Sequence, residues 1–183
     1  MAMIRIRKLN RLKDYDYSKE GYYFVTVCTK DRVEWFGDIK DGAMVLNECG
    51  KIANHHWMGI PQYYKNAELD KFVIMPNHIH GIIVIVGTEQ CVGTEQCSVP
   101  TTGNTKKYGL LSKIVKSFKD ITTKQMRSQC GVHFSWQRSF HDHIIRNANE
   151  LTHIREYIVN NPIKWDSDRN NPENDALGRA VPF

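Results

Sequence analysis

Two extended runs separated by a short turn constrain the fold of this chain more than any other feature. The runs are AELDKFVIM at 67–75 and HIHGIIVIV at 78–86. Both are rich in branched and aromatic residues, which favour strands, and the intervening Pro76-Asn77 pair favours a turn. Runs this close in sequence predict an antiparallel hairpin, with His78 and His80 just past its turn.

Apolar periodicity predicts the remaining elements. A spacing of two is typical of half-buried strands, and spacings of three and four are typical of amphipathic helices. The further predicted strands are 22–29 and 133–140. The predicted helices are 45–64, ended by Pro61, then 110–127, and a C-terminal helix that Asn149 caps and Pro162 ends. This order predicts a ferredoxin-like α+β sandwich, with a four-stranded antiparallel sheet, helices, and an added C-terminal helix carrying Tyr157.

The chain has 183 residues, the size of one globular domain. We expect a basic N-terminal arm at 1–20, a folded domain at 21–165, and a polar, loosely held tail at 166–183. The tandem hexapeptide VGTEQCVGTEQC, followed by Gly, Ser, Thr and Pro residues, predicts a flexible insertion at about 87–107.

Several classes of protein are excluded by absent motifs. The longest apolar run, Ile82 to Val86, is far shorter than a membrane span, and the basic N-terminus is not followed by an apolar stretch of the secretory kind. The five cysteines contain no CxxC pair, so we expect reduced thiols and a cytoplasmic location. No P-loop, GxGxxG, nucleophile elbow or HExxH is present.

Two pairs of residues are candidates for chemistry. His78 and His80 are two apart on a predicted strand, so they share a face and could share one metal ion. Tyr157 and Asn161 are four apart on a predicted helix and can face one site together. The residues also allow plainer roles: polar histidines at a hairpin end, a boundary tyrosine, and an asparagine that ends a helix.

The chain contains, in this order from Gly21 to Trp165, the segments GYYFVTVCT, VIMPNHIHGIIV, LLSKIVKSFK, SWQRSFHDHIIRN and REYIVNNPIKW. This series resembles the single-tyrosine HUH transposases, and most closely the REP-associated tyrosine transposases. A PNHIHG segment followed downstream by YIVNNP is a specific combination.

The resemblance implies a role for each candidate. His78 and His80 are similar to the HUH pair, Tyr157 to the nucleophile, and Asn161 to the third metal ligand, where many mobile relatives carry Gln. The implied cofactor is Mg²⁺ or Mn²⁺. The implied reaction is cleavage and strand transfer of single-stranded DNA with a REP-like hairpin, through a 5′-phosphotyrosine. A monomer and a homodimer both remain open.

Basic residues cluster in two regions, near the start of the chain and between 106 and 127. We expect DNA contacts from these clusters and from two later arginines. The candidates are Arg7, Lys8, Lys113, Lys116, Lys119, Arg138 and Arg146. Two other hypotheses remain: a non-catalytic nucleic-acid-binding module on a ferredoxin-like sheet, and a metal-dependent hydrolase that uses the histidine pair.

Overall fold

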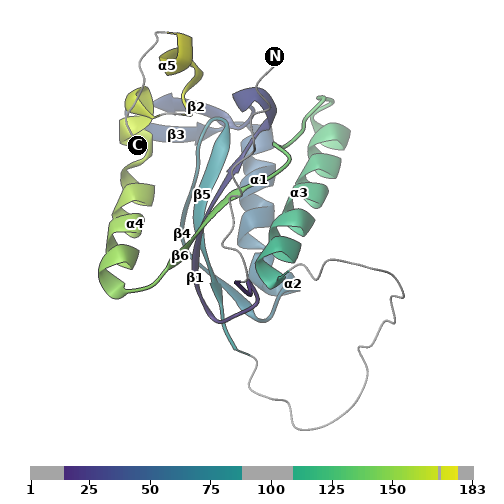
Figure 1. The fold of residues 1–183 in the computed structure, drawn as a ribbon. Helices are drawn as coiled ribbons and strands as arrows, with labels where there is room; N and C mark the ends of the chain where they lie inside the picture. The colour runs from purple at the N-terminus through teal and green to yellow at the C-terminus, as the bar shows by residue number, and fades with distance from the viewer. Residues whose placement is uncertain (1–14, 88–108, 169, 177–183) are drawn as a thin grey trace, which may run out of the picture.

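A four-stranded antiparallel sheet forms the centre of the computed structural model, which describes residues 15–87, 109–168 and 170–176 (Figure 1). Its strands are β1 (Gly21–Cys28), β4 (Ala67–Ile74), β5 (His78–Ile85) and β6 (His141–Ile145). The spatial order is β4-β5-β1-β6, and every neighbouring pair is antiparallel. The predicted α+β class with a four-stranded antiparallel sheet is therefore confirmed.

Two predicted segments fall largely outside the described residues. The N-terminal arm, including Arg7 and Lys8, lies outside them up to residue 14. The duplicated insertion lies outside them from 88 to 108.

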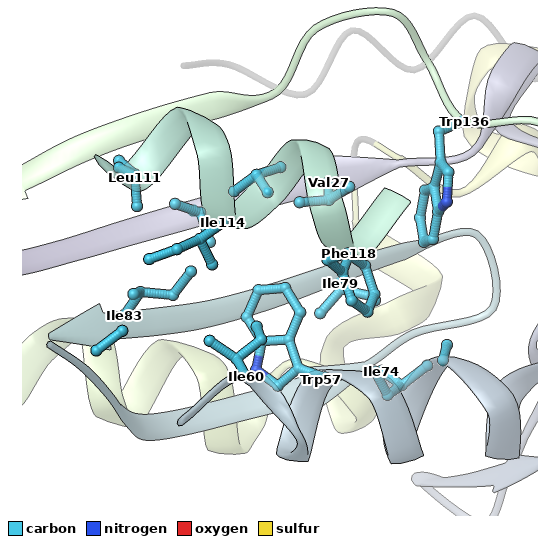
Figure 2. Packing of buried hydrophobic residues seen from close by; sticks show 14 of the residues in the cluster. Val27, Trp57, Ile60, Ile74, Ile79, Ile83, Leu111, Ile114, Phe118 and Trp136 are labelled. Carbon is cyan, nitrogen blue, oxygen red and sulfur yellow. The ribbon is translucent and has the colours of Figure 1, made fainter. Parts of the chain in front are cut away.

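Helices cover both faces of the sheet (Figure 1). They are α1 (Glu48–Met58), the short α2 (Ile60–Tyr63), α3 (Leu110–Gln129) and α4 (Ala148–Asn160). The larger core lies between the sheet and helices α1 and α3, with α4 on the opposite face (Figures 1 and 2). No helix in the described part of the chain has the length and apolarity needed to cross a membrane.

Strand β5 contributes to both faces because its side chains alternate. Ile79 and Ile83 belong to the larger core, whereas Ile82 packs in a second cluster with Ile145 and Ile158 of α4. Between them, Gly81 allows a close approach of Trp57: a Cβ there would lie 2.5 Å from the indole. The histidines at 78 and 80 share the parity of Ile82, so they face the α4 side.

A second hairpin was not expected from the sequence. It consists of β2 (Gly37–Lys40) and β3 (Ala43–Leu46), and the predicted helix at 45–64 begins only at Glu48, after an Asn47 cap. Asp41 and Gly42 both have positive φ angles, as the two central residues of a type I′ hairpin turn require. The Asp-Gly pair was thus the sequence signal for this hairpin. Helix α1 ends at Met58, three residues before Pro61, which lies in the first turn of α2, where proline is well tolerated.

The predicted strand at 133–140 is wrong, and the fourth strand of the sheet is β6 at 141–145. Within 133–140 only Trp136 forms an isolated bridge, with Thr29. The aromatic alternation has a different cause: Phe134 and Trp136 are buried in the core, where the Trp136 indole donates a hydrogen bond to Thr122 Oγ1 at 3.0 Å. Burial of these two aromatic side chains in the core, in a segment that is not a strand, explains the alternation.

The C-terminal region is more ordered than expected. Helix α4 is capped by Asn147 rather than Asn149, since the Asn147 side chain accepts from the Glu150 amide. Beyond α4 come the 3-10 helix η2 (Pro162–Ser167) and α5 (Pro172–Ala176). Another 3-10 helix, η1 (Lys30–Arg32), follows β1. Asn170, Asn171 and Asn174 are buried, so this part of the tail packs on the domain.

Candidate active site

The two histidines of β5 lie together under α4. Their ring centroids are 4.4 Å apart, and their exposed fractions are 0% for His78 and 2% for His80. Strand β1 supplies the neighbouring position, because Thr26 pairs with His80 in the sheet register. The pair is therefore buried, which is not expected of polar residues at an exposed hairpin end.

Each imidazole has one nitrogen held by a neighbouring side chain. Nδ1 of His78 lies 2.8 Å from Oδ1 of Asn77, and Nδ1 of His80 lies 2.8 Å from Oγ1 of Thr26. Phe24 stacks on the His80 ring, with centroids 5.3 Å apart. These contacts fix the ring orientations, as outer-shell partners of metal-binding histidines commonly do.

Tyr157 reaches the histidines from α4. Its hydroxyl oxygen lies 3.2 Å from Nε2 of His80, and its ring meets that of Phe24 edge to face. The side chain is 42% exposed, so one side of the ring is open to solvent. The structure thus brings Tyr157 and the histidine pair together within one chain.

Asn161 and Asp168 complete this cluster. Asn161 is 2% exposed, and its Oδ1 has no hydrogen-bond partner among the described residues. Its Nδ2 donates to Oδ2 of Asp168 at 3.5 Å. Ligand atoms of Asp168, His78 and His80 all lie within 4.8 Å of one another. Asp168 is not predicted from the sequence, because no periodicity or motif links a carboxylate in a polar tail to a distant strand.

Helix α4 is held on the sheet by both apolar and ionic contacts. Ile158 is fully buried against Ile82 and Ile145. At the edge strand, Arg155 binds Asp70 through two guanidinium nitrogens, with Nε at 3.0 and 3.2 Å from the two carboxylate oxygens. The guanidinium holds the pKa of Asp70 below its usual range, so this carboxylate stays charged at neutral pH. These contacts position Tyr157, which lies two residues after Arg155 on α4.

The candidate DNA-binding residues are dispersed. Lys113 and Lys116 are exposed on α3, across the sheet from Tyr157, and Arg138 and Arg146 are exposed near β6. Lys119 differs, since its ammonium donates to the backbone oxygens of Gln137 and Ser139, each at 2.9 Å. Burial lowers the pKa of Lys119 to about 8. Its side chain anchors the segment before β6.

Two known proteins are similar to this chain in sequence, one uncharacterized and one named as a transposase. The chain is 38% identical over 175 residues to an uncharacterized protein of Haemophilus influenzae, covering 92% of this chain and 94% of the relative. It is 24% identical over 149 residues to a second protein of that organism, named "Putative REP-associated tyrosine transposase", covering 81% and 74% of the two chains. No family model matches the chain.

A solved structure shares the fold. It is a REP-associated tyrosine transposase bound to a REP hairpin, with a TM-score of 0.56 and 22% identity, covering 85% of this chain and 74% of that one. The chain therefore has the same fold as that protein. The chain is thus similar in sequence to one protein named as a REP-associated tyrosine transposase and similar in fold to another.

Proposed function

We propose that this protein cleaves single-stranded DNA at hairpin-flanked sites and transfers strands through a 5′-phosphotyrosine on Tyr157. The observation that carries the proposal is the 3.2 Å contact between the Tyr157 hydroxyl and Nε2 of His80. A phenol has a pKa near 10, well below that of an aliphatic alcohol, so its anion forms more readily. The partial exposure of Tyr157 supports access by a phosphodiester.

A divalent cation, Mg²⁺ or Mn²⁺, is the proposed cofactor, with His78, His80 and Asn161 as its ligands. Asp168 adds a carboxylate to this set. The fit rests on donor chemistry: imidazole nitrogens, a carboxylate, and a buried amide oxygen that lacks a partner in the described part of the chain. When bound, the cation polarises the scissile phosphate and stabilises developing charge. Two imidazoles favour Mn²⁺ over Mg²⁺.

The proposed covalent step conserves the phosphodiester bond energy. The bond between the Tyr157 oxygen and phosphorus forms while the bond from phosphorus to the 3′-oxygen breaks. The phenol loses its proton, and the leaving oxygen takes one up to give a free 3′-OH. Attack by a 3′-OH on the phosphotyrosine reverses these changes, so strands can be rejoined without ATP.

Hairpin DNA is the proposed partner. The solved relative of similar fold is bound to a REP hairpin, and the present chain carries exposed basic side chains on α3 and near β6. We propose that the catalytic unit extends past residue 165, where the sequence predicted its end, because Asp168 lies beside the histidine pair.

A denaturing gel of the protein incubated with REP-type hairpin DNA and Mn²⁺ tests the proposal directly. Cleavage with a covalent protein–DNA product supports it. Cleavage without that product favours a hydrolase that activates water at the histidine pair. Binding without cleavage favours a non-catalytic module.

The active site is proposed to be completed within one chain, since Tyr157 contacts His80 of the same molecule. A mixture of Tyr157→Phe protein with the His78→Ala/His80→Ala double variant should therefore form no adduct, because neither chain holds a full site. The measurement is the same denaturing gel, with wild type diluted by either variant as the control. Adduct formation in the mixture would show that sites are shared between two chains.

Replacing Lys113 and Lys116 with Gln should weaken hairpin binding and lower the slope of log affinity against log salt by up to about two units, one per lost phosphate contact. Lys119 is left unchanged, because its ammonium is engaged by backbone carbonyls. The control is Lys51→Gln/Lys65→Gln, which removes the same charge from other exposed positions. Equal slopes for both doubles would exclude a specific role of the α3 face.

Asp70→Asn should lower adduct formation about 10-fold while leaving hairpin affinity nearly unchanged, since a loosened α4 misplaces the tyrosine.

The lowered pKa of Asp70 predicts the pH dependence of stability. The ion pair of Asp70 with Arg155 contributes fully to the free energy of unfolding above pH 3.8, the ordinary pKa of the carboxyl group. This contribution is lost as the pH falls through the lower pKa that Asp70 has in the folded protein. The free energies of unfolding of the wild type and Asp70→Asn, measured with denaturant, should therefore become equal in acid. Glu68→Gln, an exposed change on the same strand, is the control; an equal effect there would contradict the role of Asp70.

A further inference from the structure

Asn77 lies in the turn between β4 and β5 and is almost completely buried, with an exposed fraction of 1%. Its Nδ2 donates to the backbone oxygen of Arg32 at 3.0 Å and to that of Asn170 at 2.8 Å. Its Oδ1 lies 2.8 Å from Nδ1 of His78. All three contacts join Asn77 to segments around the candidate active site.

These contacts fix the direction of the amide. A carbonyl oxygen can only accept, so the two backbone oxygens require the NH₂ end of the amide on their side. Oδ1 must then face His78. Because Oδ1 is also only an acceptor, Nδ1 of His78 must carry the proton and donate it. In the neutral imidazole, Nε2 then has the lone pair, which is the form that a metal ligand requires.

The contact between His80 and Thr26 imposes no such constraint. Its Nδ1 contacts the hydroxyl of Thr26, which can either donate or accept a hydrogen bond. The environment of His80 therefore does not select a tautomer through this contact. The two histidines differ in this respect although they share one strand face.

Asn77 also connects the turn to the C-terminal segment. The Asn170 oxygen accepts from Asn77, and the Asn170 backbone nitrogen donates to Oδ1 of Asp168 at 2.6 Å. A continuous path of hydrogen bonds thus runs from His78 through Asn77 and Asn170 to Asp168.

We propose that Asn77 is a positioning residue that sets the Nδ1–H tautomer of His78 and holds the segment carrying Asp168 beside it. This inference rests on the proposed function for its metal, but the tautomer belongs to the metal-free protein. Asn77 acts through His78 and Asp168 and touches no reacting atom.

The test is a long-range ¹H–¹⁵N correlation spectrum of metal-free protein with ¹⁵N-labelled histidine, at about pH 8, where an ordinary imidazole is neutral. His78, identified by the loss of its signals in His78→Gln, should show the Nδ1–H pattern. An Nε2–H pattern in wild type would overturn the proposal without any variant.

Variants at position 77 separate the two roles. Asn77→Ala removes the acceptor, so His78 should shift toward Nε2–H. Asn77→Asp keeps an acceptor oxygen and should retain Nδ1–H, while its link to the Asn170 oxygen is weakened. Thr26→Val is the matched control and should leave the His78 pattern unchanged. Retention of Nδ1–H in folded Asn77→Ala protein, checked by its other histidine signals, would overturn the proposal.

Metal binding supplies a second measurement. Titration of the apo protein with Mn²⁺, followed by electron paramagnetic resonance of the free ion, should show affinity reduced about 10- to 100-fold in Asn77→Ala. Unchanged affinity would contradict a positioning role. A protein with the expected tautomer and Mn²⁺ affinity but no covalent DNA product would instead refute the proposed function and leave this inference standing.

Discussion

Tyr157→Phe should fold and bind hairpin DNA as the wild type does, yet form no covalent protein–DNA product. Phenylalanine keeps the ring and its edge-to-face contact with Phe24, and removes only the oxygen that lies 3.2 Å from His80. Without that oxygen no phosphotyrosine can form, so adduct yield should fall to background rather than by a graded factor. The measurement is the denaturing gel with Mn²⁺, alongside hairpin affinity and thermal unfolding.

Tyr63→Phe is the matched control, because this substitution makes the same chemical change away from the site. Tyr63 is highly exposed on α2. It should retain full adduct formation. Mass spectrometry of the wild-type product should locate the nucleotide on the peptide that contains Tyr157. A nucleotide on another tyrosine, or cleavage by the Phe variant at the wild-type rate, would show that the nucleophile is misassigned.

Replacing both His78 and His80 with alanine should abolish Mn²⁺-dependent cleavage and weaken Mn²⁺ binding by more than about 100-fold, because two proposed ligands are lost. Both rings are buried, so the variant should also unfold at a lower temperature, as cavity-forming changes do. Folding must therefore be checked by thermal unfolding, and hairpin affinity should persist because it does not require the metal.

His55→Ala/His133→Ala is the control for this double variant, since it removes two exposed imidazoles outside the site. It should leave cleavage and Mn²⁺ affinity unchanged. Asp168→Asn offers a milder change that keeps the side-chain shape and removes one charge; it should lower Mn²⁺ affinity without opening a cavity. Full Mn²⁺-dependent activity in the His78→Ala/His80→Ala variant would rule out the proposed metal site.

Local pattern was sufficient for most of the fold. The β4–β5 hairpin, β1, α3 and α4 follow the periodicities seen in the sequence, because burial against one face of a sheet or helix leaves a spacing of two or of three and four. The same logic placed His78 and His80 on one strand face. It failed at 133–140, where Phe134 and Trp136 are buried by packing alone, and it missed the hairpin whose Asp-Gly turn was present in the sequence.

The sequence by itself determined which residues share a face: the histidine pair on β5, and Tyr157 and Asn161 one turn apart near the end of α4. Only the tertiary structure decided what those faces meet. Asp168 reaches the histidines, Asn77 bridges His78 and Asn170, and the ammonium of Lys119 is directed toward backbone carbonyls. The physical reason is that periodicity records the burial of a side chain along its own element, whereas these contacts join segments up to 93 residues apart and leave no local pattern.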